Sequence, residues 1–156
     1  MPDRGINVEH PLVPLDKTVA VIELEQLGRT DDIRGPQMRR AAITGYHLST
    51  IGADFAAAGA PFGIKFYDPP HSREYFDRSD NAPFAKAGVP AHCIAVALEF
   101  PDYHQPGDKW QKLDYTNMAE VVPAIEAGLV SIASQTDPPR WTTRMPVQAA
   151  PRVPPD

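Results

Sequence analysis

A carboxylate and an imidazole stand where two buried strands would end, and together they could bind a divalent metal ion. Glu25 directly follows the apolar run TVAVIEL at residues 18–24. His104 lies in the polar segment 102–108, downstream of the apolar run AHCIAVAL at residues 91–98. Carboxylate oxygens and imidazole nitrogens are both metal ligands in proteins. Taken alone, each residue is a weak signal, because most carboxylates and histidines in loops are simply solvated.

The elements that would position these two residues predict an α/β protein with a layered sheet. Short β-branched and apolar runs predict strands over residues 18–24, 41–46, 61–67 and 91–98. Helical patterns predict helices over residues 49–58 and 81–87, and a last helix with Thr116 as its N-cap. The polar stretches 25–38, 68–80 and 99–113 are predicted to be loops. Since ligands bind beyond the carboxyl ends of strands in such sheets, the loops after Leu24 and Leu98 are expected to carry the site.

Size and composition are typical of one globular domain of 156 residues. Apolar residues make up 42% of the chain, charged residues 22%, and the net charge is −5. No basic stripe is present, which disfavours nucleic-acid binding. The single cysteine, Cys93, is expected to be a small buried core residue. No signal peptide and no membrane-spanning segment is recognisable, so no membrane partner is expected and the compartment is left open.

The chain divides into three parts by composition. Residues 1–17 are a lead-in, and residues 18–134 carry the alternating strands and helices. Residues 135–156 form a Pro-rich stretch that we expect to be a flexible or loosely docked tail, in a chain that contains 18 prolines. Trp141 could pack part of this tail against the surface.

Three ordered motifs resemble one enzyme family. They are LEQLGRTD at residues 24–31, RSDNAPFAKAGVPA at residues 78–91 and DYHQPGDKWQKLDYTNM at residues 102–118, preceded by His10-Pro11 and Pro14. From about Glu9 to Ser134 the sequence is similar to the C-terminal half of metallopeptidase family twenty-eight, the di-zinc aminopeptidases and carboxypeptidases related to glutaminyl cyclase. Ordered motifs over most of a chain are more specific than one short pattern.

The resemblance implies a fold, a chemistry and roles for five residues. The fold would be part of a three-layer α/β/α domain with a mixed, mostly parallel sheet, truncated at its N-terminal half. The chemistry would be hydrolysis of a terminal peptide bond in a peptide substrate by water that two zinc ions activate. Glu25 would bind one zinc ion and His104 the other. Ser79 and Asp80 would lie beside the site, and Tyr103 would line the pocket or be a packed aromatic.

Three positions qualify the resemblance. Glu25 stands where the family more often has aspartate, and its longer side chain can still bind metal. Asn81 replaces a usual histidine, which weakens any claim about substrate contacts there. Asp108 is expected to be a turn residue rather than a partner of the site.

A count of ligands argues against activity of this chain alone. The family's other ligands and its general base belong to an HxD motif, a bridging aspartate and a Glu-Glu pair in its N-terminal half. Residues 1–17 contain none of these motifs, and His10 is their only histidine. A catalytic zinc ion needs about three protein ligands. We therefore expect no tight zinc binding and no turnover.

Three hypotheses remain open. The chain is a split peptidase that a separate N-terminal half complements, a non-enzymatic binding module that retains the half-fold, or a non-functional remnant. An exposed sheet edge would also allow self-association.

Overall fold

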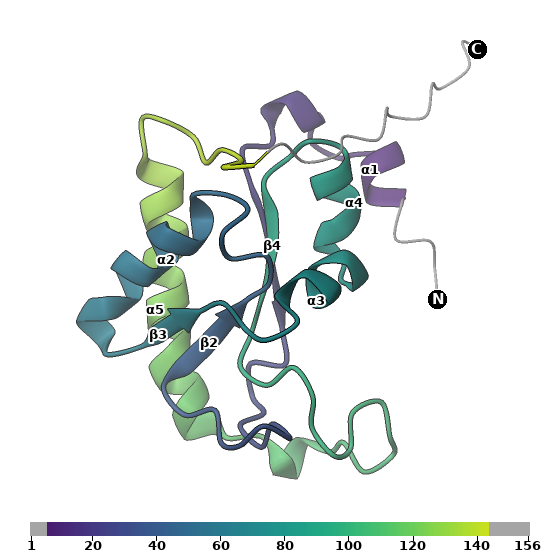
Figure 1. Cartoon of the computed structure of the whole chain (residues 1–156), viewed down its shortest axis with the longest axis vertical. Helices are drawn as coiled ribbons and strands as arrows, with labels where there is room; N and C mark the ends of the chain where they lie inside the picture. Colours follow the sequence, from purple (N-terminus) through teal and green to yellow (C-terminus); the bar gives the residue numbers. More distant parts are fainter. Residues whose placement is uncertain (1–5, 144–156) are drawn as a thin grey trace.

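A four-stranded mixed sheet forms the centre of the computed structural model, which describes residues 6–143 (Figure 1). Its strands are β1 (Val21–Glu25), β2 (Arg40–Ile43), β3 (Lys65–Tyr67) and β4 (Ala91–Ala95), in the order β1-β4-β2-β3. β1 runs parallel to β4 and β2 parallel to β3, whereas β2 and β4 are antiparallel. The carboxyl ends of β1 and β4 therefore meet at one end of the sheet.

Helices cover both faces of the sheet and give three layers (Figure 1). One face carries α2 (Ile51–Gly59) and α5 (Tyr115–Ser134), and the other carries α3 (Ser72–Arg78) and α4 (Asn81–Lys86). The short helix α1 (Ile6–Glu9) and three single 3₁₀ turns, Leu15–Lys17, Ala60–Phe62 and Trp110–Lys112, complete the described elements. The predicted three-layer fold with a mixed, mostly parallel sheet is confirmed.

The main core lies between the sheet and the pair α2–α5. Phe55 of α2 packs edge-on against Phe66 of β3, with 5.4 Å between the ring centroids. α5 passes close to this pair because it presents a glycine there: a Cβ on Gly128 would lie 2.4 Å from Phe55 Cδ1. Any larger residue would push α5 off the sheet, so this position fixes the distance between the two helices.

The alternation of side chains along β1 decides which residues face the second helix layer. Ile22 packs into the core under α2 and α5, whereas Val21 packs with Phe76 on the side of α3 and α4. Since successive residues of a strand point to opposite faces, Glu23 and Glu25 share the face of Val21. Two carboxylates are thus directed toward the end of α3.

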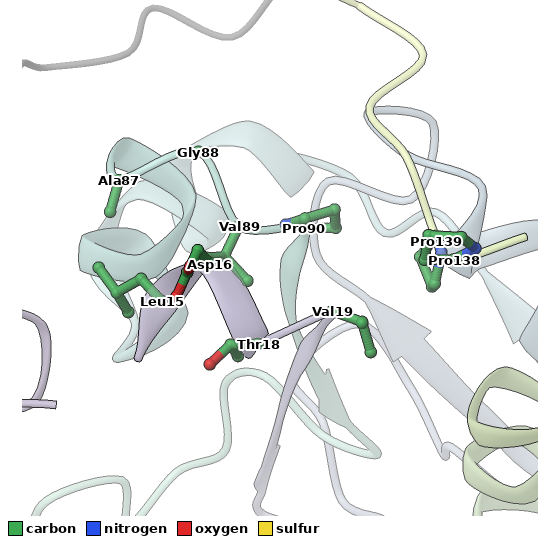
Figure 2. A pocket seen from close by; sticks show the side chains of 10 residues that line it. All are labelled: Leu15, Asp16, Thr18, Val19, Ala87, Gly88, Val89, Pro90, Pro138 and Pro139. Atoms are coloured by element: carbon green, nitrogen blue, oxygen red, sulfur yellow. The ribbon is translucent and has the colours of Figure 1, made fainter. Parts of the chain in front are cut away.

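The C-terminal segment 136–143 crosses the amino ends of β1 and β4. Trp141 forms a β-bridge with Ser49, and its indole N–H donates to the Gly88 carbonyl at 2.9 Å. Figure 2 shows the hollow at this end, about 490 Å³ in volume, between the residues before β1, the residues before β4 and Pro138 and Pro139. Residues 144–156 of the predicted tail lie outside the described part of the chain.

Three details of the elements differ from prediction. The strand predicted over residues 61–67 is shorter, because the chain first forms the 3₁₀ turn Ala60–Phe62 and β3 begins only at Lys65. The stretch 68–80 is not a continuous loop, because it contains α3, whose Phe76 is buried and whose surface carries the i,i+4 ion pair Arg73–Asp77 at 3.0 Å. The last helix is capped by Asp114, not Thr116: the Asp114 carboxylate accepts the Asn117 N–H at 2.9 Å.

Among the helices that the structure describes, none is both long enough and apolar enough to cross a membrane.

Candidate functional site

A cleft of about 480 Å³ opens where β1 and β4 end. Four of the five predicted site residues, Glu25, Ser79, Tyr103 and His104, line it together. They come from the end of β1, the end of α3 and the loop that follows β4. Asp80 is not among the lining residues, although its negative charge acts on the neighbouring Glu23. The parallel pairing of β1 and β4 is what brings these loops to one place.

Glu25 and Ser79 form an acidic wall of the cleft, and Glu23, which does not line it, contacts Ser79. The Ser79 hydroxyl lies 2.9 Å from Glu23 Oε2 and 2.6 Å from Glu25 Oε1. The Asn81 backbone N–H also donates to Glu23 Oε2, at 3.0 Å. A hydroxyl has one proton to donate, so Ser79 cannot donate fully to both carboxylates. A proton held between them satisfies all three groups.

Burial is the main reason why Glu23 is easier to protonate than an exposed glutamate. Desolvation, followed by the hydrogen bond and the charge of Glu25, raises the pKa of Glu23 to about 7. A bound cation would oppose this effect, since it would favour both carboxylates in their charged form. This wall therefore has the electrostatic character of a cation site.

Cys93 lies beneath the two glutamates. One ligand atom from each of Glu23, Glu25 and Cys93 lies within 4.8 Å of the others. Cys93 is only 1% exposed, which confirms the prediction of a buried residue. Burial, and then the charges of Glu25 and Glu23, raise the pKa of its thiol above the usual range, so it remains a neutral thiol and not the thiolate that binds metal.

Another part of the cleft lining is aromatic. The rings of Tyr103 and His104 stack with 4.0 Å between centroids, and Tyr103 packs edge-on against Phe100 at 5.4 Å. His104 and Gln26, which both line the cleft, adopt a left-handed backbone conformation, with φ of 58° and 51°. Non-glycine residues rarely occupy this region, and such positions cluster at functional sites.

A buried aspartate joins the loop after β1 to the end of the β4 segment. Asp32 Oδ2 accepts the N–H groups of Leu98 at 2.9 Å and Glu99 at 3.2 Å, and its Oδ1 accepts the Arg34 N–H at 2.9 Å. Glu99 in turn accepts the Tyr75 hydroxyl at 2.6 Å. These bonds hold the rim of the cleft in place.

Sequence reasoning missed Glu23, Asp32 and Arg29 as parts of this site. Glu23 had a signal that went unused: two glutamates two residues apart in an apolar run indicate one polar strand face. Asp32 and Arg29 had no comparable signal, because the groups that they bind lie in the loop after β4.

Comparisons with known proteins place the chain among peptidases. The model of "Peptidase family M28" matches residues 5–127. The fold resembles a zinc aminopeptidase from Bacillus subtilis, with a TM-score of 0.60 and 16% identity over 81% of this chain and 31% of that one. It also resembles an aminopeptidase from Aneurinibacillus sp. strain AM-1, with a TM-score of 0.60 and 17% identity over 94% and 32% of the two chains.

The Legionella pneumophila aminopeptidase LapA gives a TM-score of 0.57 and 17% identity, over 76% of this chain and 32% of that one. A search of curated proteins gives no match. The chain thus spans about a third of the length of these solved aminopeptidases.

Proposed function

Because this chain belongs to peptidase family M28, we propose that it forms the C-terminal part of a zinc-dependent exopeptidase domain that cleaves terminal residues from peptides. The observation that supports the proposal is the cleft that Glu25 and His104 both line. These two residues come from different loops, and one offers a carboxylate and the other an imidazole, both ligands that zinc accepts.

Each of the four predicted residues that line the cleft has a role in this proposal. Glu25 would bind one zinc ion and His104 a second, and a bound zinc ion would supply the acidity that turns water into a nucleophile at neutral pH. Ser79, at 2.6 Å from Glu25 Oε1, would orient that carboxylate. Tyr103 stacks on His104 and would hold its ring in the cleft. A peptide would lie in the cleft, beside its acidic wall and the aromatic part of its lining.

The residues present do not complete a two-zinc centre. A catalytic zinc ion takes about three protein ligands and a water, whereas Glu25 and His104 supply one ligand each. Glu23 adds a carboxylate on the side of Glu25 and nothing on the side of His104. We therefore propose that this chain alone binds zinc weakly and does not turn over peptides. The alternative is a non-enzymatic module that binds a peptide in the same cleft. It also predicts weak zinc binding, but it predicts that the peptide binds without metal.

A metal titration tests the proposal. Zinc added to the ¹⁵N-labelled chain is expected to shift the resonances of cleft residues, with a dissociation constant weaker than micromolar. Glu25→Gln and His104→Gln should each abolish part of these shifts, whereas His47→Gln, at an exposed histidine outside the cleft, should leave them unchanged. An aminoacyl-anilide assay on the same samples should show no hydrolysis.

Two results would contradict it. Zinc shifts that survive both cleft variants would remove the site from this cleft. Tight binding of two zinc ions, with hydrolysis that a chelator stops, would show that the chain is active alone.

The outer edge of β1 is the surface where we propose that a complementing polypeptide pairs. Among the described residues, β1 pairs only with β4, so its other edge has free backbone groups. Val19, which precedes β1, and Leu24, within β1, are exposed apolar residues. On α5, in the layer next to β1, the exposed apolar residues include Val122, Leu129 and Val130. Exposed apolar surface beside an unpaired strand is typical of an interaction site.

In the absence of such a partner, the isolated chain is expected to self-associate. Light scattering after size exclusion should show a mass that rises with protein concentration, and Leu24→Lys should reduce this rise because it places a charge beside the open edge. Phe62→Lys, at an exposed residue just before β3, the strand at the other edge of the sheet, is the matched control. A monomer at every concentration would count against this edge as an interface.

A further inference from the structure

A buried arginine connects the two loops that carry the proposed zinc ligands. Arg29, four residues after Glu25, is only 2% exposed. Its guanidinium binds Asp31 through two hydrogen bonds, from Nε at 2.8 Å and from Nη2 at 2.6 Å. It then reaches the loop after β4, where Nη1 donates to Asp108 Oδ1 at 2.6 Å and Nη2 donates to Asp102 Oδ2 at 3.1 Å.

The two aspartates in that loop stand on either side of His104. Asp102 precedes the Tyr103–His104 pair by one residue, and Asp108 follows it by four. Arg29 therefore holds both ends of the short segment that presents the imidazole. Its Cζ atom also lies 4.0 Å from the centroid of the Phe100 ring, on which Tyr103 packs. One side chain thus fixes both the backbone and the aromatic support of His104.

The segment needs such support because its backbone is unusual. His104 has a φ of 58°, which costs a non-glycine residue free energy unless the surroundings enforce it. The turn is closed by the hydrogen bond from the Gln105 N–H to the Asp102 carbonyl at 2.7 Å. Without an anchor, the segment would relax to a commoner conformation and the imidazole would turn away.

The charge balance makes Arg29 hard to replace. Three carboxylates gather around it, and without a central cation they would repel one another. The hydrogen bonds of Arg29 lower the pKa of Asp31, and those of Lys112 and Arg29 lower the pKa of Asp102. The ammonium of a lysine is a point charge, whereas the planar guanidinium donates to three carboxylates at once.

On this geometry we propose that Arg29 is the positioning residue for His104, and that it sets the placement of the histidine loop against the loop of Glu25. The inference rests on the proposed function because His104 is a proposed zinc ligand there. The placement of the His104 ring can be measured whether or not the chain binds zinc. A residue with only a structural role would stabilise the fold and leave the orientation of His104 unchanged.

The proton NMR shifts of the His104 ring, measured in the full chain, test this proposal. The stacked Tyr103 ring shifts the His104 ring protons upfield, and a His104→Gln sample identifies their signals. Arg29→Gln is expected to remove this shift while the signals of the buried His92 stay in place, which shows that the fold persists. Arg29→Lys should restore the shift only in part, and Arg39→Gln, at an exposed arginine paired with Glu120, should not affect it.

Zinc provides the second readout. The zinc concentration at half-saturation should rise about tenfold or more in Arg29→Gln, as is typical when a group that orients a ligand is lost. Unchanged His104 signals in a folded Arg29→Gln chain would overturn the inference. If Arg29→Gln does not fold, Asp108→Asn, which removes one arm of the network, is judged by the same criterion. If zinc fails to perturb His104 in the unaltered chain, the proposed function fails, while the ring shift still decides the role of Arg29.

Discussion

Replacement of Asp32 by alanine is expected to lower the free energy of unfolding by about 3 to 5 kcal/mol, because it leaves buried N–H groups without an acceptor. Asp32 is 7% exposed and accepts three backbone N–H groups, those of Arg34, Leu98 and Glu99. Leu98 is itself buried, so water cannot fully replace the lost acceptor. The effect should also open the rim of the cleft.

Urea unfolding followed by circular dichroism measures this loss. Asp32→Asn should lie between the wild type and Asp32→Ala, because an amide oxygen still accepts hydrogen bonds but carries no charge. Asp16→Ala, at an exposed aspartate near the N-terminus, is the control and should change the stability by less than about 0.5 kcal/mol. If Asp32→Ala is as mild as the control, then these hydrogen bonds do not hold the loop.

Acidification from pH 7 to pH 4 should lower the free energy of unfolding by about 3 kcal/mol through the titration of a single histidine. His92 is fully buried, and burial lowers its pKa from 6.5 to about 4. Below pH 6.5 this histidine is protonated in the unfolded chain, whereas in the folded chain it stays neutral down to about pH 4. The stability contributed by neutral His92 is therefore complete above pH 6.5 and is lost as the pH falls through this window.

Burial keeps His92 neutral, and its hydrogen bonds fix which ring nitrogen carries the single proton. Nδ1 lies 2.8 Å from the Thr44 carbonyl, which can only accept, so Nδ1 carries the proton. Nε2 lies 2.7 Å from the Ser49 hydroxyl and accepts from it. Ser49 Oγ in turn accepts the Ile51 N–H at 3.2 Å, at the start of α2. A second proton on the ring would force the Ser49 hydroxyl to turn away.

Chemical denaturation at a series of pH values tests this linkage. His92→Gln should be less stable at pH 7 but should lose less stability between pH 7 and pH 4 than the wild type. The comparison is between the two slopes, since the carboxylates titrate in both proteins. Parallel slopes would mean that His92 does not control acid stability.

The sequence patterns located all four strands because each lies in or beside a short apolar run, but they did not fix the strand ends: β3 covers only Lys65–Tyr67 of the predicted stretch 61–67. They failed at residues 68–80, where Pro69, Pro70 and many charged residues concealed α3. That helix depends on ion pairs at its surface and on the burial of Phe76 by the sheet, and neither leaves a periodic apolar pattern.

The candidate site was predictable only in part, for a similar reason. Strand order could place Glu25 and His104 near each other once β1 and β4 were neighbours. The alternation along β1 could have revealed Glu23. The contacts of Arg29 with Asp102 and Asp108 link residues far apart in the chain, and a turn was the simpler interpretation of Asp108. Such contacts follow from the fold and not from local sequence.

The position of Trp141 has a practical consequence for work with this protein. Trp141 and Thr142 form hydrogen bonds with Gly88 and Leu48, near the amino end of β4. Glu25 and His104 lie at or beyond the carboxyl ends of β1 and β4, at the other end of the sheet. In Figure 1 the C-terminal segment is at the top and the loop after β4 at the bottom. A fluorophore or a surface-immobilisation handle attached at Thr143 would leave the mouth of the cleft facing the bulk solution. Biosensor measurements with injected metal or peptide could then be made without steric interference from the support.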